Sequence, residues 1–397
     1  MKKLRVGVLF GGRSGEHEVS LLSAASVLNA IDKKKYDVVP IGITKEGRWL
    51  TASHAERLLK GEDAVGVEPR HLRAGDPEAT SAAAVLAKGE GVVVPPMPGM
   101  NHSALLPFET SAHEVHAAAN PIDVDVIFPV LHGTFGEDGT IQGLLELADI
   151  PYVGAGVLGS ATGMDKDVMK KLFRDAGLPI VKHVAVLRSA WRSAPKKVRK
   201  QIETALKYPV FVKPANLGSS VGISKVHDGS EVAAAMDEAA RFDRKIVIEQ
   251  GVGGAKGKAR EIECSVLGND EPIASIPGEI VPIKEFYDYD AKYLYEGSEL
   301  IIPAKLPKAK QKEVQRLAVQ AFQAVDCAGL ARVDFLMEPR TGKMFVNEIN
   351  TMPGFTSISM YPKLWAASGI EYAELIARLI QLGLQRYEEK KQNRYAR

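Results

Sequence analysis

The residues best suited to chemistry gather between Arg332 and Gly354, in the sequence RVDFLMEPRTGKMFVNEINTMPG. The pattern predicts two strands joined by a short turn. Residues two apart on a strand share a face, so Asp334 lies beside Arg332, and Glu348 lies beside Asn350. If the strands pair, two carboxylates and an amide oxygen converge next to an arginine. Oxygen ligands of this kind usually hold Mg²⁺ at nucleotide sites, which predicts an enzyme that uses ATP.

A second candidate is KPANLGSSVGIS, from Lys213 to Ser224, where one strand ends and a loop of small residues opens the next. Backbone N–H groups of glycine and serine can approach phosphate oxygens closely, and lysine adds a positive charge. The segment is not a P-loop, because no G-K-[ST] opens a helix. By itself it could equally be a flexible hairpin with a surface lysine. Together with the acidic strands downstream, it predicts phosphate binding.

Two further turns follow predicted parallel strands, at the strand ends where α/β sheets bind ligands. The first, GGRSGEHEVSL, lacks the glycine spacing of a dinucleotide-binding turn. Its Glu16 either interacts only with a helix dipole or contacts the amino group of a substrate, and for Glu18 the dipole is favoured. The second, HGTFGEDGTIQG, begins at His132, which is either a structural donor or a substrate contact.

A tyrosine-rich segment at 285–299, EFYDYDAKYLYEGSE, is predicted to be a long loop. Such a loop could be a lid that closes over a nucleotide and excludes water. The alternative is a packed Ω-loop that covers only the protein itself.

The elements that must position these residues alternate between strands and helices in the first part of the chain, which predicts a parallel sheet. Residues 51–121, rich in Ala, Gly, Pro and polar residues, are interpreted as a mostly surface elaboration of this part. The expected strands are 4–10, 37–43, 123–130, 183–187, 209–213, 221–226, 245–249, 260–267 and 272–276. The expected helices are 19–31, 137–148, 165–176, 195–206, 229–241 and 307–325.

Composition sets outer limits on function. A chain of 397 residues predicts two or three domains, and its 45% hydrophobic content is ordinary for a globular protein. A formal charge of +2 and the lack of a basic, aromatic-rich stripe argue against a nucleic-acid partner. No apolar run approaches the ~18 residues of a membrane span, so we expect a cytoplasmic protein. The two cysteines, Cys264 and Cys327, are expected to be packed thiols.

In this order, the motifs resemble the ATP-grasp superfamily, and more closely the D-alanine–D-alanine ligase family. The resemblance covers nearly the whole chain except 51–121, which resembles the longer first domain of one subgroup. It is carried by GGRSGEHEVSL, LHGTFGEDGTIQG, MDK at 164–166, VKPANLGSSVG, YDYDAKY, RVDF and NEINTMPGFTSISMYP. The implied fold class is α/β, with an α+β C-terminal part. The implied domains are an N-terminal parallel α/β substrate domain (1–153), a central ATP-grasp subdomain (154–249) and a C-terminal subdomain with metal and substrate sites (250–397).

The resemblance also implies roles for individual residues. For ATP, these are phosphate contacts at Lys166 and Lys213, adenine contacts at Glu249, Gln250 and Val252, a ribose contact at Glu261, and further nucleotide contacts at Ser220 and Lys292. Two Mg²⁺ ions, for which Mn²⁺ can substitute, are assigned to Asp334, Glu348 and Asn350. The catalytic set is Glu16 on the first substrate's ammonium, Ser219 and Tyr293 as its hydrogen-bonded partners, and Arg332 with the Gly354 backbone on the tetrahedral intermediate. Substrate contacts are His132, and Ser359 and Met360 on the second substrate's carboxylate.

The implied activity is ATP-dependent joining of two D-alanines to D-alanyl-D-alanine through an acyl phosphate, for peptidoglycan precursors. Two alternatives stay open: a D-alanine–D-lactate ligase, and a non-catalytic nucleotide sensor with the same fold. The resemblance associates a tyrosine at position 293 with an amine as the acceptor, which favours the dipeptide. The expected partners are D-alanine and ATP, without nucleic acid or membrane, and the resemblance suggests a homodimer.

Overall fold

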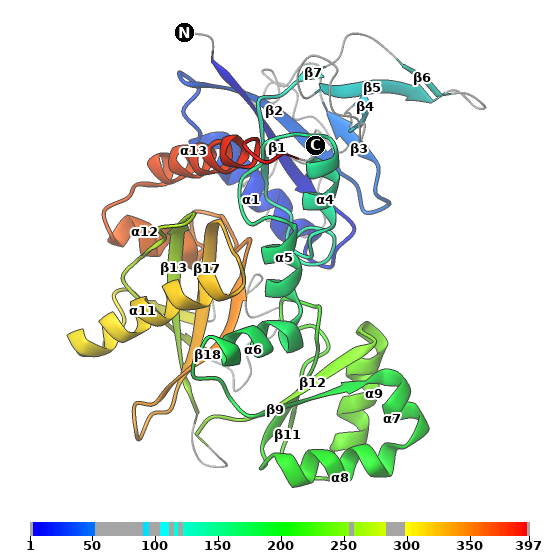
Figure 1. The fold of residues 1–397 in the computed structure, drawn as a ribbon, viewed down its shortest axis with the longest axis vertical. Helices are drawn as coiled ribbons and strands as arrows, with labels where there is room; N and C mark the ends of the chain where they lie inside the picture. The colour runs from blue at the N-terminus through cyan, green and yellow to red at the C-terminus, as the bar shows by residue number, and fades with distance from the viewer. Residues whose placement is uncertain are drawn as a thin grey trace.

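The computed structural model describes residues 3–51, 90–94, 104–110, 115–117, 122–253, 258–282 and 298–394 (Figure 1). Within these residues the strands form three separate sheets. The first sheet contains β1 (Leu4–Gly11), β2 (Tyr36–Ile43), β3 (Trp49–Thr51), β4 (Glu90–Val93), β5 (Ala104–Thr110), β6 (Val115–Ala117), β7 (Ile122–Asp123) and β8 (Val126–Pro129). Its helices are α1 (His17–Ala30) and α4 (Thr140–Leu147).

The first sheet is parallel only at one end of its strand order, which ends β2-β1-β8. β1 runs parallel to β2 on one side and to β8 on the other, as the alternating pattern predicted. From β2 outward the order is β3, β4, β5 and β6, and each of these pairs is antiparallel. The expectation of a mostly surface elaboration at 51–121 was therefore wrong for its described strands. They extend the sheet, and Val92 and Leu105 are buried in its core.

The second sheet has the order β11-β10-β12-β9, and all its pairs are antiparallel. It has a core of its own, to which its helices contribute. Strand β11 is shorter than predicted, because Ser219, Ser220 and Gly222 adopt positive φ and turn the backbone before a strand can start. The elements are β9 (His183–Leu187), α7 (Arg188–Ser193), α8 (Pro195–Ala205), β10 (Val210–Pro214), β11 (Ser224–Val226), α9 (Val232–Phe242) and β12 (Lys245–Gln250).

The third sheet has the order β16-β15-β13-β17-β18, with β14 beside β13. Figure 1 shows α11 lying across β13 and β17, and residues of all three elements share one core. The elements are β13 (Arg260–Gly268), β14 (Ile273–Ala274), β15 (Gly278–Pro282), β16 (Ser298–Ile301), α11 (Lys308–Ala324), β17 (Gly329–Met337) and β18 (Met344–Asn350). Before this sheet in the chain come α5 (Val157–Met164) and α6 (Lys166–Asp175), and after it come α12 (Met360–Ala367) and α13 (Tyr372–Lys390).

Helix α6 was expected to belong with the central part of the chain. Its buried Met169 and Phe173 instead pack into the core of the third sheet. The expected domain limits themselves stay a prediction, but this packing places α6 where it can reach both the second and the third sheet.

Helix α13 packs against β8 of the first sheet and against α1, whereas α12 lies against the third sheet and adds Tyr361 and Trp365 to the same core as α13. Phe355, Trp365 and Leu379 share one core with Val8 on β1 and Phe128 on β8, and Figure 1 shows α13 beside α1. The first sheet is therefore completed by residues that come after the third.

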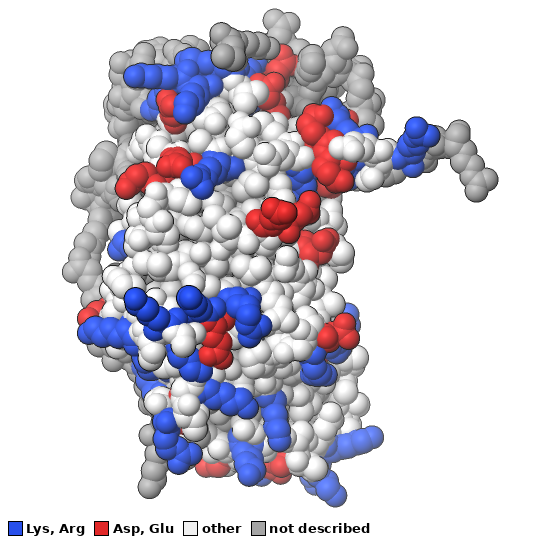
Figure 2. Space-filling view, turned by 60° about the vertical axis from the view of Figure 1, so that its left-hand side comes forward, with Lys and Arg blue, Asp and Glu red and all other residues white. Residues whose placement is uncertain are grey.

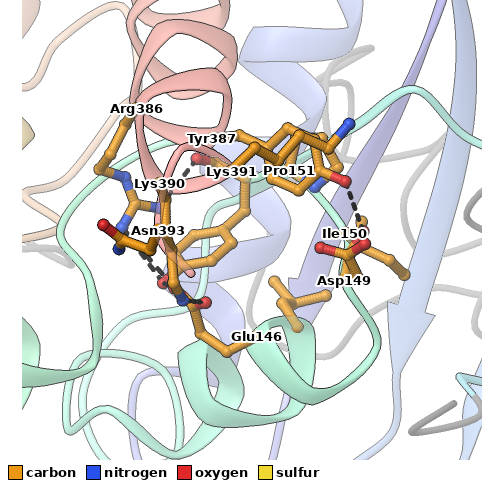
Figure 3. Close-up of a pocket in the computed structure, with 11 residues that line it drawn as sticks. Glu146, Asp149, Ile150, Pro151, Arg386, Tyr387, Lys390, Lys391 and Asn393 are labelled. Carbon is orange, nitrogen blue, oxygen red and sulfur yellow. Dashed lines mark hydrogen bonds and ion pairs between the residues drawn. The ribbon is translucent and has the colours of Figure 1, made fainter. Parts of the chain in front are cut away.

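The far end of α13 meets α4 across a pocket of about 310 Å³ (Figure 3). Glu146 on α4 contacts Lys390 and accepts a hydrogen bond from the Tyr152 hydroxyl at 2.7 Å. The Arg386 guanidinium lies 4.2 Å from the centre of the Tyr152 ring and donates to the Tyr152 carbonyl at 3.3 Å. These contacts fasten α13 to the first part of the chain.

The face shown in Figure 2 has a broad area without charged side chains across its middle, and basic and acidic side chains are mixed in the groups above it. Basic side chains become more frequent toward the end of the molecule that holds α8, whose sequence is PKKVRKQIETA. Among the described residues, no helix is both long and apolar enough to cross a membrane.

Candidate active site

The predicted pairing of the two acidic strands is observed. Asp334 stands opposite Glu348, and Arg332 stands opposite Asn350. Both Arg332 Nε and one of its terminal nitrogens donate to the Asp334 carboxylate at 2.7 Å. The Asn350 amide donates to the same carboxylate at 2.9 Å. The register shifts directly after Asp334, so a bulge lies within the group.

Strand β13 adds a residue that the sequence did not single out. Glu263 is buried, and its Oε2 lies 3.0 Å from Arg332 Nε. Arg332 is thus held between carboxylates on two neighbouring strands. A guanidinium stays charged at any ordinary pH, so this setting fixes its direction and leaves its charge intact.

The donor set of the hairpin fits a hard divalent cation. Asp334, Glu348 and Asn350 offer carboxylate and amide oxygens from paired strands, which is the oxygen chemistry that Mg²⁺ prefers. In the part of the chain that the structure describes, no three His, Cys, Asp or Glu side chains cluster into a complete cage. The other ligands of such an ion would therefore be phosphate oxygens and water, which is usual at nucleotide sites.

Lys166, at the first turn of α6, reaches toward this hairpin. Its Nζ lies 3.5 Å from Glu348 Oε2 and donates to the Leu217 carbonyl at 2.8 Å. The helix starts here because the Asp165 carboxylate accepts the free N–H groups of Asp167 and Val168. The cap therefore places a lysine between the acidic hairpin and the loop at 214–220.

Lys213, on β10, takes part in a buried group of three charges that we call the lysine–glutamate trio: Lys170, Lys213 and Glu249. Lys213 Nζ lies 2.8 Å from Glu249 Oε2, and Lys170 Nζ lies 3.0 Å from Glu249 Oε1. Burial by itself would raise the pKa of Glu249, but the two lysine charges outweigh it and lower this pKa to about 2. Glu249 is therefore an anion at neutral pH.

The trio bears on the nucleotide contacts implied by the resemblance. Both oxygens of Glu249 face lysines, and the Gln250 N–H donates to the Lys182 carbonyl at 2.9 Å. Val252 follows β12 and is half-buried, and Glu261 lies on β13 opposite Ile280. Their roles at adenine and ribose stay predictions.

Lys170 was missed, although the sequence held a signal for it. Residues four apart on a helix lie on the same face, so the predicted helix placed Lys170 directly behind Lys166.

Glu16 lies at the meeting point of three loops. The Ser219 hydroxyl donates a hydrogen bond to its Oε1, as the resemblance implied. A Cβ added to Gly133 would come within 2.6 Å of Glu16 Oε2, and one on Gly218 within 3.0 Å. Glycines on both sides therefore leave room for the carboxylate. This packing goes beyond a simple interaction with the helix dipole.

Both ring nitrogens of His132 have protein partners. Nε2 lies 2.9 Å from the Ser23 hydroxyl, and Nδ1 lies 3.0 Å from the Met352 carbonyl. Burial lowers the pKa of His132, so its ring is neutral at physiological pH. These contacts support the structural interpretation of His132, and a direct substrate contact stays a prediction.

Glu137 is a buried acid in the turn after β8. It accepts hydrogen bonds from the Gly133 N–H at 2.8 Å and the Met352 N–H at 3.2 Å. Burial, and then the nearby charge of Glu16, raise the pKa of Glu137 to about 8. The carboxyl is thus largely protonated at neutral pH, and it ties the turn after β8 to the segment after β18.

The remaining predicted residues fall into two groups. Ser359 directly precedes α12. Its hydroxyl lies 2.7 Å from that of Thr356, and a Cβ on Gly354 would lie 3.1 Å from the same Ser359 oxygen. Met360 is buried beside β15. Lys292 and Tyr293, together with nearly all of the predicted lid, lie outside the described residues.

Family models match both parts of the chain. The model described as "D-ala D-ala ligase N-terminus" matches residues 5–155, and "D-ala D-ala ligase C-terminus" matches residues 172–381. The chain belongs to the D-alanine–D-alanine ligase family. It is therefore an enzyme with the ATP-grasp fold, and the predictions of family, fold class and enzyme class are confirmed.

Individual relatives match this chain over nearly their whole length. A D-alanine–D-alanine ligase of Heliobacterium modesticaldum is 49% identical over 394 residues, covering 99% of this chain and 98% of the relative. The solved D-alanine–D-alanine ligase of Coxiella burnetii is 35% identical with a TM-score of 0.78, over 99% and 97% of the two chains. VanG D-Ala:D-Ser ligase of Enterococcus faecalis is also 35% identical with a TM-score of 0.78, over 96% and 100%.

Proposed function

We propose that this enzyme joins two D-alanines to D-alanyl-D-alanine at the expense of ATP, through an acyl phosphate, and so supplies peptidoglycan precursors. The observation that carries the proposal is the convergence of Asp334, Glu348 and Arg332 on one hairpin, with Lys166 at its edge. An acidic pair, a fixed arginine and a lysine are what activation of a carboxylate by ATP needs at one place.

The residues divide the work between the two ends of the site. Lys166 and Lys213 are placed to bind phosphate oxygens and neutralise charge as the phosphoryl group moves to the first substrate's carboxylate. A divalent ion held by Asp334, Glu348 and Asn350 would supply charge neutralisation at the same oxygens. We assign two Mg²⁺ ions to this set, with Mn²⁺ as a substitute. Glu16, held by Ser219, is placed to bind the first D-alanine's ammonium.

Arg332 then serves the second step. The amine of the second D-alanine attacks the acyl carbon, an oxyanion forms, and phosphate leaves. A guanidinium fixed between Glu263 and Asp334 needs little reorganisation to stabilise that oxyanion. The Gly354 backbone is proposed as a second donor, and Ser359 and Met360 as the positions that hold the acceptor's carboxylate.

One loop supports a single site by joining its two ends. Lys166, 3.5 Å from Glu348, donates to the Leu217 carbonyl at 2.8 Å. Ser219, two residues later in the same loop, donates to Glu16.

The identity of the acceptor is the finer part of the proposal. The two solved structures, one named as a D-alanine–D-alanine ligase and one as a D-Ala:D-Ser ligase, are each 35% identical to this chain and do not separate the two acceptors. Relatives named D-alanine–D-alanine ligase are 47–49% identical to this chain over nearly its whole length. We therefore favour D-alanine over D-serine or D-lactate, and assign the discrimination to Tyr293 in the proposed lid. We also propose a cytoplasmic homodimer without nucleic-acid or membrane partners.

Product analysis tests the proposal. The purified enzyme is incubated at neutral pH with ATP, Mg²⁺ and an equal mixture of D-alanine, D-lactate and D-serine, and the products are separated by mass. D-alanyl-D-alanine should dominate, with one ADP formed per product. ADP release without any dipeptide or depsipeptide would refute the ligase assignment. A dominant D-alanyl-D-lactate or D-alanyl-D-serine would refute the choice of acceptor.

A further inference from the structure

Lys170 is a buried cation that the reaction outlined above does not use. Its side chain is 0% exposed, whereas that of Lys213 retains 9%. Because no part of this side chain reaches the protein surface, Lys170 does not contact a ligand bound in a surface cleft. Its Nζ has two polar contacts, Glu249 Oε1 at 3.0 Å and the Asn347 carbonyl oxygen at 2.9 Å.

These two contacts lie on different sheets. Glu249 is on β12 of the second sheet, and Asn347 is on β18 of the third, directly before the proposed metal ligand Glu348. Lys170 itself is on α6, whose neighbours Met169 and Phe173 are packed in the third sheet's core. The ammonium therefore joins the strand that carries Glu249 to the strand that carries half of the acidic hairpin.

Placing a lysine at this buried position costs folding free energy. An ammonium removed from water loses its hydration, and a well-packed apolar side chain of similar size often serves stability as well or better. Stability alone therefore gives no reason for a charge in the middle of α6.

The charges of the trio supply a reason. Two lysines and one glutamate leave a net charge of +1. Without Lys170, the Glu249 carboxylate would be compensated only by Lys213, and that pair would be neutral. With Lys170 present, the negative charge of Glu249 is balanced by Lys170 on the side away from the loop. The positive charge of Lys213 then remains available to an anion at the loop that follows β10.

We propose that Lys170 is a positioning residue for ATP: by compensating Glu249 and tying β12 to β18, it leaves Lys213 with an uncompensated charge for the nucleotide's phosphates. The inference rests on the proposed function, because it takes ATP as the anion. Lys170 acts on ATP binding through Glu249 and does not contact the substrate.

The first experiment compares Lys170→Met with Lys171→Met. Lys171 is the next residue of α6, its side chain is 61% exposed, and its contact is the Asp167 carboxylate at 2.8 Å. We expect Lys170→Met to raise the KM for ATP about tenfold or more and to leave the KM for D-alanine within about twofold. Lys171→Met should change neither. An unchanged KM for ATP in Lys170→Met, or a loss confined to kcat, overturns the proposal.

A second comparison separates charge compensation from mere packing. In a Glu249→Gln background the carboxylate that Lys170 compensates is gone, so adding Lys170→Met should change the KM for ATP less than about threefold. Equal effects in both backgrounds would show that Lys170 does not act through Glu249. If Lys170→Met alone fails to fold, the test uses only the two proteins that carry Glu249→Gln, with and without Lys170→Met. A difference of more than about threefold between their KM values for ATP would overturn the proposal. If the wild-type enzyme forms no dipeptide or depsipeptide from ATP, the proposed function fails instead.

Discussion

Replacing Gly133 with alanine should weaken binding of the first D-alanine while leaving the fold intact. Gly133 has a φ of +76°, and a Cβ there would lie 2.6 Å from Glu16 Oε2. Ordinary van der Waals contact begins at 3.4 Å, so the carboxylate must move by 3.4 − 2.6 = 0.8 Å. The obstructing atom is the end of a flexible side chain, so it will move and the backbone will not.

Two costs follow from this geometry. The left-handed backbone conformation costs an alanine about 1–2 kcal/mol of folding stability. The displaced carboxylate loses alignment with Ser219 and with the substrate ammonium, and a misplacement of this size can cost up to roughly a hundredfold. We therefore expect the KM for D-alanine at the first site to rise about ten- to hundredfold, with the KM for ATP nearly unchanged.

Gly177→Ala is the matched control. Gly177 has a φ of +73°, but a Cβ there would meet nothing within 4 Å. Both variants should lose similar stability in urea unfolding, and only Gly133→Ala should lose affinity for D-alanine in initial-rate measurements. The reasoning is refuted if both variants bind D-alanine normally, or if Gly177→Ala shows the same rise in KM.

Three further predictions concern the metal ligands, a buried carboxyl and the α4–α13 contact. Asp334→Ala should abolish ADP formation with D-alanine by removing a metal ligand, and normal ADP release would rule out that role. Because the pKa of Glu137 rises from 4.5 to about 8 on folding, its contribution to stability is full below pH 4.5 and is lost as the pH rises to about 8. Glu137→Gln should therefore flatten the fall in unfolding free energy between about pH 5 and 8, and an unchanged slope would contradict the assigned pKa. Arg386→Ala should cost about 2–3 kcal/mol in urea unfolding, from a lost ring contact and hydrogen bonds, whereas Arg378→Ala, which removes an exposed pair with Glu374, should cost less than about 1 kcal/mol.

Local chemistry was the part that could be predicted from the sequence. The period-two pattern placed Arg332 and Asp334 on one face of their strand, and Glu348 and Asn350 on one face of theirs. The register that sets Asp334 opposite Glu348 depends on the bulge after Asp334, which the sequence did not predict. The contact between Glu16 and Ser219, 203 residues apart, came only from the resemblance to a family. No periodicity in a single chain specifies which distant loops meet.

Other features could not be predicted because they depend on packing. Glu137 lies just before helix α4, where an acidic residue is common, and only its burial beside Glu16 raises its pKa. Lys170 lies one helical turn after Lys166, which places both on one face, but the sequence does not show that α6 lies between two sheets and so buries Lys170. The strands at 90–93 and 104–110 were missed, although the first has a signal in the sequence: three valines at 92–94 followed by the prolines and glycine of PPMPG.

The core shared by the first sheet and helices α12 and α13 has a consequence for how the protein is made. Val8 and Phe128 leave the ribosome long before Trp365 and Leu379, the residues that cover them. The second sheet, by contrast, finds its whole core within residues 186–248. Since segments generally fold as units once their core is complete, the middle of the newborn chain should become protease-resistant first. The first sheet, although synthesised earliest, should wait with its apolar face open to chaperones until α13 arrives.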